Sequence, residues 1–290
     1  MSNKPAVIRK KQSAGSIAFK IVAYTVCILL AALSIFPFIV MIVNSTRDTF
    51  SIQSSAISFI PGTNLSKNLH ILTSKDMFNP WRGLENSLII AACATALTVY
   101  FSTLTAYGLI AYDWKLRGAF FTMILCVMMI PATVTSIGFY QFIYKIKMTN
   151  NFLPLILPAI AAPGTVFFMR QFMVASLPME IVQSARVDGS GEFRTFNQIV
   201  LPIMKPAMAT QAIFAFVSKW NELFIPSILL TDKTKYTMPI MVSLLNGDAY
   251  KVEYGAVYLG ILLTVLPLFV IYFALSKYII AGVALGGVKG

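Results

Sequence analysis

Four consecutive residues within one long apolar stretch carry side chains suited to holding a ligand: Lys219, Trp220, Asn221 and Glu222. Trp and Asn are typical sugar-contacting types, because an aromatic face stacks on the C–H groups of a sugar ring and an amide bonds its hydroxyls. Ionisable groups inside a membrane span cost about 2.5–3.5 kcal/mol each and usually face a bundle interior. The alternative interpretation is a local Lys219–Glu222 pair, three residues apart, that touches no substrate. Both interpretations remain open.

Residues for enzymatic chemistry are scarce in this chain. The one histidine, His70, leaves no histidine-based metal site or catalytic triad, and no Gly-x-x-x-x-Gly-Lys-Ser/Thr phosphate loop occurs. The three cysteines, Cys27, Cys93 and Cys126, lie in apolar stretches and have neither zinc-ligand nor disulfide spacing. We therefore expect no enzyme activity, no cofactor and no metal.

The composition indicates a membrane protein. Of 290 residues, 57% are hydrophobic and 12% are charged, whereas soluble domains have about 45–50% apolar and about 25% charged residues. The formal net charge of +12 suggests nucleic acid, but the basic residues are spread between apolar spans rather than clustered. We predict an all-α integral membrane protein that contacts lipid and no nucleic acid.

Six stretches approach the length of about 20 apolar residues that a bilayer core requires. They are Ile21–Val43, Ser87–Tyr107, Ala119–Phe142, Phe152–Val174, Ala207–Leu230 and Ala256–Ser276. The second is rich in Ala, Ser and Thr, which predicts close packing inside a bundle, and Pro131 interrupts the third. We expect one membrane domain, residues 21–276, between tails at residues 1–20 and 277–290.

The distribution of basic residues predicts the orientation. Six spans put both termini on one side, and a cytoplasmic N-terminus leaves twelve Lys and Arg residues inside and nine outside. The basic run at residues 9–11 precedes an apolar stretch too long for a signal peptide, so it begins an uncleaved first helix. We predict that both termini are cytoplasmic.

The inner connection between spans four and five, residues 178–202, has a distinct local pattern. After Pro178, which suits a first helical turn, polar and apolar residues segregate onto opposite faces. Gly189 suits the left-handed position that ends a helix. A second short helix is expected over residues 192–200, ended by Pro202. The pattern predicts two helices lying parallel to the membrane and joined by a glycine hinge, although an interfacial loop resting on lipid would share this amphipathicity.

This segment resembles the EAA loop of ABC importer permeases, which reads Glu-Ala-Ala, three variable residues, Gly and, about nine residues later, Ile-x-Leu-Pro. The corresponding strings here are Gln183-Ser184-Ala185, Gly189 and Ile199-Val200-Leu201-Pro202. The run Ala185–Gly189 is especially similar to the sugar-importing, maltose-permease type. Gln183 and Ser184 depart from the pattern. If the family's Glu forms an ion pair, Gln183 offers only a neutral hydrogen bond, for which Glu180 on the same face would compensate.

The resemblance covers nearly the whole chain and implies a type I ABC importer permease, with six transmembrane helices and a cytoplasmic two-helix coupling loop. Such a subunit would sit in a bacterial or archaeal cytoplasmic membrane and form half of a translocation path for a sugar or oligosaccharide. The implied partners are a second homologous permease in a heterodimer, two ABC ATPase subunits and an extracytoplasmic solute-binding protein.

The resemblance also implies site residues. Those for ATPase coupling are Glu180, Gln183, Ser184, Ala185, Asp188 and Gly189. The substrate path is expected, from the polar residues within the spans themselves, at Trp220, Asn221 and Glu222, together with Asn86. One alternative is a secondary transporter driven by an ion gradient, which would use repeats and intramembrane carboxylates. The chain has one such carboxylate, Glu222, and no visible repeat. A membrane scaffold is a third class.

Overall fold

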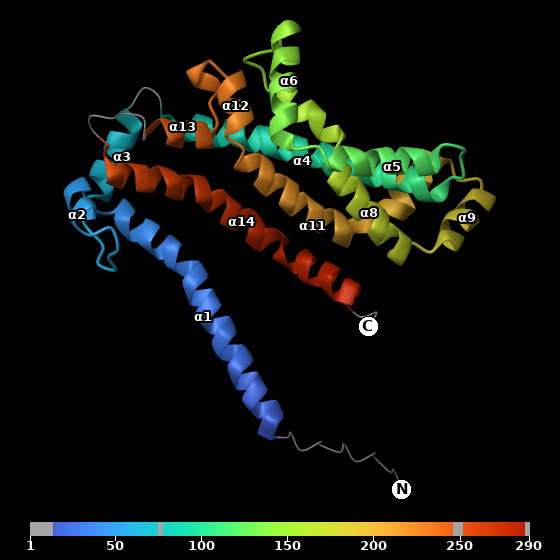
Figure 1. The fold of residues 1–290 in the computed structure, drawn as a ribbon, viewed down its shortest axis with the longest axis horizontal. Coiled ribbons are helices and arrows are strands. Elements are labelled where there is room, and N and C mark those ends of the chain that lie inside the picture. Colours follow the sequence, from blue (N-terminus) through green and yellow to red (C-terminus); the bar gives the residue numbers. More distant parts are fainter. Residues whose placement is uncertain (1–13, 75–77, 246–251, 288–290) are drawn as a thin grey trace.

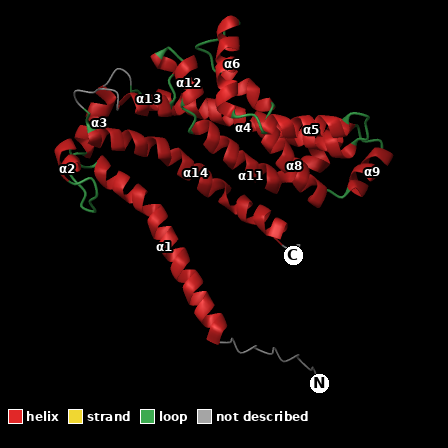
Figure 2. Ribbon diagram, in the orientation of Figure 1, coloured by secondary structure: helices red, strands yellow, loops and turns green. Residues whose placement is uncertain are grey.

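The computed structural model describes residues 14–74, 78–245 and 252–287, and this part of the chain is built of helices and connecting loops (Figure 1). Figure 2 shows no strand in it, which confirms the all-α prediction. In chain order the elements are α1 (Ala14–Ser45), α2 (Thr49–Ser54), α3 (Leu65–Ser74), α4 (Pro80–Ala111), α5 (Arg117–Met128), α6 (Ala132–Lys145), α7 (Leu153–Ile156), η1 (Leu157–Ile160), α8 (Pro163–Ser176), α9 (Met179–Val187), α10 (Glu192–Thr195), η2 (Phe196–Val200), α11 (Leu201–Trp220), α12 (Phe224–Leu229), η3 (Lys233–Lys235), α13 (Met238–Leu245) and α14 (Tyr254–Gly287).

Five segments of the described chain are long and apolar enough to cross a membrane. They are Ala18–Ser45, Pro80–Ala111, Leu153–Ser176, Glu192–Trp220 and Tyr254–Ala274. Helix α14 continues through the first part of the expected C-terminal tail, to Gly287. Residues 1–13 and 288–290 of the two expected tails lie outside the described residues.

The third expected span, Ala119–Phe142, is two helices instead of one. Pro131 has φ −60° and ψ 129°, an extended conformation between α5 and α6, because proline lacks the N–H that would continue the helix. Helix α5 has 12 residues and is therefore about 18 Å long, shorter than a core of about 30 Å. Helix α6 turns away from the bundle (Figure 1). The structure thus has a break at the expected interruption, Pro131, and α5 and α6 do not form one membrane-crossing helix.

The fifth expected span, Ala207–Leu230, begins and ends earlier than predicted. The helix runs without a break from α10 through the π-helical turn η2 into α11 and ends at Trp220. Pro202 does not stop it, contrary to the prediction, because the turn just before it is wider: the Leu201 N–H donates to the Phe196 carbonyl, five residues back. The second helix of the loop is therefore the first part of the fifth span.

Helix α4 packs against both α8 and α11 at the centre of the bundle. Its small residues allow this close approach, since Ala91, Ala94 and Ala106 are fully buried. This confirms the burial predicted for the second span. The largest core cluster joins α4 to α8, α9 and α11, and its members include Tyr107, Met169, Met173, Val182, Phe196 and Met204. The loop helix α9 is thus anchored in the same core as the spans.

A buried polar network shapes the opposite end of the molecule, where α1 meets α2 and α3. Arg47 donates to Asn44 Oδ1 at 2.9 Å and to the carbonyls of Ser51 and Ser55 at 2.8 Å each. Asn68 donates to the Arg47 carbonyl at 2.9 Å. These bonds satisfy carbonyls within and just after α2 and one carbonyl shortly after α1. They hold α2 and α3 beside the start of α14, while the rest of α1 diverges from the bundle (Figure 1).

Candidate functional site

Helix α9 has one buried face and one exposed face, as the sequence predicts, except that Ile181, expected on the apolar face with Val182 and Ala185, is exposed. Val182 is fully buried in the core cluster, and Ala185 is also buried. Glu180, Gln183 and Ser184 are exposed. Burying one face of a short helix fixes its orientation on the bundle. Of the residues expected to couple to an ATPase, Ala185 therefore packs inward, and the others on this helix face outward.

Gly189 ends α9 in the predicted left-handed conformation, with φ +76°. The Ser190 N–H donates to the Ala185 carbonyl at 2.9 Å, and the Gly189 N–H donates to the Arg186 carbonyl at 3.0 Å. These two bonds form a Schellman cap. Among the described residues no atom lies within 4 Å of the position that a Cβ of Gly189 would take. The requirement for glycine is therefore conformational rather than a matter of space.

A cluster that we name the hinge bridge spans this glycine turn; it consists of Arg186, Glu192, Tyr107 and the Ala111 carbonyl. Arg186 Nε donates to Glu192 Oε1 at 2.7 Å, and Arg186 Nη2 donates to the Ala111 carbonyl at 3.1 Å. The Tyr107 hydroxyl donates to Glu192 Oε2 at 3.0 Å. The bond to Glu192 also holds the pKa of Arg186 above its usual value, so the pair stays charged. The hinge bridge ties α9 and α10 to the end of α4.

Sequence reasoning missed the hinge bridge. Arg186 and Glu192 have opposite charges and flank a helix-ending glycine turn. That signal was available, because such a turn brings its two sides together. Tyr107 lies 85 residues from Glu192 in the chain, and no local pattern points to it.

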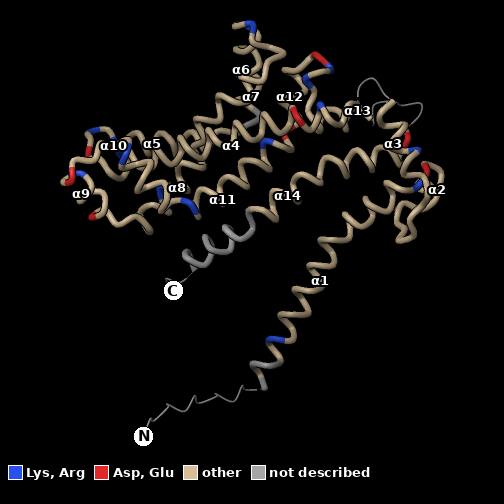
Figure 3. The backbone as a smooth tube through the Cα atoms, turned by 180° about the vertical axis from the view of Figure 1, so that it is seen from behind, with Lys and Arg blue, Asp and Glu red and all other residues tan. Residues whose placement is uncertain are grey.

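The outer side of α9 and α10 carries large apolar side chains. Val187 is 88% exposed, Phe193 72% and Ile181 43%. Figure 3 shows acidic and basic residues at this same end of the molecule. Exposed apolar groups rimmed by polar ones are typical of protein contact surfaces. We name Ile181, Gln183, Ser184, Val187 and Phe193 the loop surface.

The four polar residues of the fifth span lie at the end of α11 rather than near the middle of a span. Lys219 Nζ donates to Glu222 Oε2 at 2.8 Å, the local pair of the alternative interpretation. Trp220 is 2% exposed, and its indole N–H donates to the Thr264 carbonyl of α14 at 3.0 Å. Asn221 is exposed and follows the last residue of α11. The chain itself therefore covers the Trp220 ring, which differs from the open aromatic face that sugar stacking requires.

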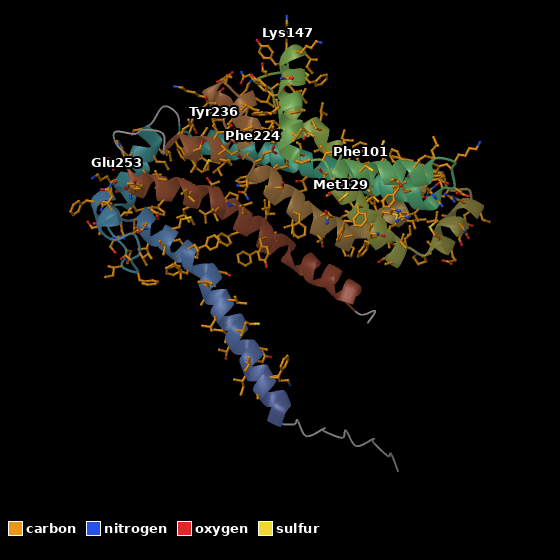
Figure 4. The ribbon with its side chains drawn as sticks, viewed as in Figure 1. Phe101, Met129, Lys147, Phe224, Tyr236 and Glu253 are labelled. Atoms are coloured by element: carbon orange, nitrogen blue, oxygen red, sulfur yellow. The ribbon has the colours of Figure 1, made fainter. Side chains whose placement is uncertain are left out.

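Asn86 lies on the buried face of α4. Its side-chain amide donates to the carbonyls of Thr234 at 3.0 Å and Tyr236 at 2.9 Å. The Ser87 hydroxyl accepts from the Met238 N–H at 2.9 Å. These bonds hold the segment after α12 against α4; Figure 4 shows Tyr236 there, on the same side of the molecule as Phe224. Asn86 thus positions a wall and does not itself open to solvent.

A cavity of about 300 Å³ lies beside the Lys219–Glu222 pair; we name it the pair cavity. Its lining comes from α6, α7, η1, α12 and the end of α11: Thr135, Ser136, Phe139, Pro154, Leu155, Pro158, Lys219, Glu222 and Ile225. The side chains of the pair are 31% and 27% exposed. The pair is therefore half-buried and forms one wall of this space.

Comparisons with known proteins agree with this geometry. Residues 98–284 match the model of a family described as the binding-protein-dependent transport system inner membrane component. The chain is 33% identical over 264 residues to the arabinooligosaccharides transport system permease protein AraQ of Halalkalibacterium halodurans, covering 90% of this chain and 93% of that one. It is 34% identical over 269 residues to the lactose transport system permease protein LacG of Rhizobium radiobacter, covering 93% and 96%.

One further relative and one solved structure extend the comparison. The chain is 30% identical over 270 residues to the sn-glycerol-3-phosphate transport system permease protein UgpE of Escherichia coli O157:H7, covering 90% of this chain and 95% of that one. The fold of the present chain is similar to that of one chain in a crystal structure of a bacterial ABC transporter involved in the import of the acidic polysaccharide alginate. The TM-score is 0.78 with 18% identity, covering 93% of this chain and 99% of that one.

Proposed function

The chain belongs to the family of binding-protein-dependent transport system inner membrane components, and from this premise we propose that it forms half of a path for a sugar or oligosaccharide. It is a multi-pass membrane permease subunit of an ABC importer. Such importers work with ATPase and solute-binding proteins. Relatives named for arabinooligosaccharides and lactose support a saccharide substrate. They give no support to the ion-gradient alternative.

We propose that the loop surface docks on an ATPase. The observation that carries this proposal is that α9 is attached to the spans by one face and leaves the other face open. Val182 is buried in the core of the spans, while Gln183 and Ser184 face outward. The hinge bridge adds a second attachment, to α4. A displacement of α9 by a closing ATPase dimer would therefore move α4 and α11 with it and reorient the path. Glu180 and Asp188, both exposed, supply acidic contacts beside Gln183.

We propose that Asn221 and Glu222 face the path. Asn221 is exposed at the end of α11, and Glu222 lines the pair cavity. Trp220 and Asn86 act behind them as positioning residues, the first by packing α11 on α14 and the second by holding η3 on α4. This arrangement divides the four expected path residues into two that meet the substrate and two that hold the wall.

We further propose an assembly of this chain with a second, homologous permease, two ATPase subunits and an extracytoplasmic binding protein. Helices α9 and α10 lie at one end of the bundle, while α2 and α3 lie at the other (Figure 1). Helix α14 runs from the α2–α3 end toward the α9 end, and α1 begins away from α2 and α3. This supports cytoplasmic termini on the same side as the loop surface.

The test compares two glycines of one turn. Gly189 has φ +76°, where a β-branched residue is strongly disfavoured, whereas Gly191 has φ −65°, which any residue adopts. In proteoliposomes containing the full transporter, Gly189→Val should abolish saccharide uptake while ATP hydrolysis continues. Gly191→Val, the matched control, should keep most uptake. Normal uptake by a stably inserted Gly189→Val complex would overturn the coupling proposal.

A further inference from the structure

The pair cavity holds one cation and one anion and no other charged group among its described lining residues. Lys219 Nζ and Glu222 Oε2 are 2.8 Å apart, so each charge largely cancels the field of the other inside the cavity. A space lined by Lys alone would attract anions, whereas this one is close to neutral. Its net charge is therefore set by these two side chains.

The cavity keeps ample hydrogen-bonding capacity for a neutral ligand. An ammonium has three N–H donors and a carboxylate has about four acceptor sites, so the one bond between Lys219 and Glu222 leaves capacity on both. Thr135 and Ser136 of α6 already interact with other groups, so the capacity for a ligand comes from Lys219 and Glu222, while Phe139 and Pro154 bring apolar surface. Alternating polar and apolar walls match a saccharide, whose surface alternates hydroxyls and C–H groups. A volume of about 300 Å³ lies at the small end of ligand pockets and suits a short stretch of such a chain.

We propose that the pair cavity is a subsite for an uncharged saccharide unit and that the Lys219–Glu222 pair excludes acidic sugars from it. This inference rests on the proposed function and names its substrate class. An entering carboxylate would lose its hydration, meet no net positive charge and approach Glu222, so its desolvation would not be offset. A neutral sugar unit exchanges water hydrogen bonds for those of Lys219 and Glu222. By name, the relatives transport both a neutral sugar, lactose, and an acidic compound, sn-glycerol-3-phosphate. Whether the cavity accepts neutral or acidic ligands is therefore a question that matters within this family.

The first experiment measures the charge that the cavity presents. In the full transporter with its native cysteines replaced by alanine, Ile225→Cys places a thiol in the cavity wall. Its reaction rates with an anionic sulfonatoethyl and a cationic trimethylammonioethyl methanethiosulfonate are compared. Their ratio should lie within about threefold of the ratio at Ser54→Cys, an exposed position on α2. Adding Glu222→Gln should raise the anionic-to-cationic ratio about tenfold or more, because a single unpaired charge then remains.

The matched control neutralises both members of the pair. In the Ile225→Cys background, the double variant Lys219→Gln with Glu222→Gln alters the same contacts as the single variant but restores a neutral cavity. Its ratio should return to within about threefold of the parent value. If Glu222→Gln leaves the ratio unchanged, or if the double variant matches the single one, the pair does not set the charge of the cavity and the proposal is overturned.

The second experiment asks which sugars occupy the cavity. A 1,4-linked digalactoside should slow labelling of Ile225→Cys, whereas digalacturonate, which carries carboxylates in place of the C6 hydroxymethyl groups, should not. Equal protection by both sugars overturns the proposed exclusion. No protection by either, in a transporter that still takes up a neutral saccharide, overturns the subsite and leaves the proposed function standing. If the wild-type transporter takes up no saccharide at all, the proposed function itself fails.

Discussion

Two ion pairs of nearly equal length have very different surroundings. Arg186 bonds Glu192 at 2.7 Å, and Lys219 bonds Glu222 at 2.8 Å. The first pair crosses a glycine turn and continues into a hydroxyl and a carbonyl of α4. The second joins two residues only three positions apart and faces a cavity.

The difference in surroundings assigns the two pairs different roles. A pair that links separate elements can carry displacement from one to another, as the hinge bridge links α9, α10 and α4. The Lys219–Glu222 pair joins the last turn of α11 to the residue two positions beyond the helix, so its main effect is on the local charge. The contact distance is therefore a poor guide to the role of an ion pair, and its neighbours are a better one.

Removing the support beneath the hinge bridge should have the largest effect. Val182→Asp buries an unpaired carboxylate in the core that joins α9 to the spans, which costs about 3–5 kcal/mol. We expect that thermal unfolding of the purified transporter will show a strongly lowered midpoint temperature, or no folded subunit at all. Gln183→Asp, on the exposed face of the same helix, should change stability by no more than about 0.5 kcal/mol. Similar losses for both variants would mean that α9 is not docked as described.

Breaking the hinge bridge itself comes next. Glu192→Ala removes the acceptor shared by Arg186 and Tyr107. After allowance for the partial exposure of the pair, we expect a loss of about 1–2 kcal/mol in stability and a larger loss in coupling. The measurement is saccharide transported per ATP hydrolysed, which should fall about tenfold. Arg194→Ala, at an exposed position on α10, is the control. Equal transport-to-hydrolysis ratios in the two variants would mean that the bridge does not transmit motion.

Adjacent residues at the end of α11 should separate stability from transport. Trp220→Phe loses the hydrogen bond to the Thr264 carbonyl and should cost about 0.5–1.5 kcal/mol of stability with little change in uptake per folded complex. Asn221→Ala, at an exposed position, should leave stability nearly unchanged and lower uptake. Thermal unfolding and uptake at matched expression measure both. The division into path and wall is contradicted if Trp220→Phe abolishes uptake in a fully stable complex.

The smallest expected effect belongs to Gln183→Glu, which restores the residue of the EAA pattern. Gln183 is exposed, and an exposed ion pair contributes about 0.2–1 kcal/mol. ATPase stimulation by substrate-loaded binding protein should therefore change by no more than about fivefold. A change well beyond that range would show that Gln183 holds a buried contact in the assembled transporter.

Features that depend on nearby residues were predictable from the sequence. The two faces of α9 and the left-handed Gly189 follow from residues within two helical turns. The burial of α4 follows from its share of small side chains. In each case the cause lies inside the segment itself, and the prediction was confirmed.

Features that depend on distant partners were not predictable in the same way. Trp220 is buried because α14 packs over its ring, and Thr264, 44 residues away on that helix, accepts its N–H. Pro202 continues a helix because a wider turn precedes it, and a propensity argument treats proline only as a stop. The interruption at Pro131 was predictable, but the direction in which α6 leaves the bundle was not, because α6 contacts α12, which lies much further along the chain, at Phe224–Leu229.

The central claim is that the loop surface meets the ATPase and passes its motion to the spans. The most direct measurement places a photocrosslinking amino acid at Ser184, exposed on α9, in the assembled transporter. We predict that illumination joins this subunit to the ATPase and that Ser54, exposed on α2 at the other end, gives no such product. Capture of only the binding protein or lipid from Ser184, with the transporter intact, would contradict the account.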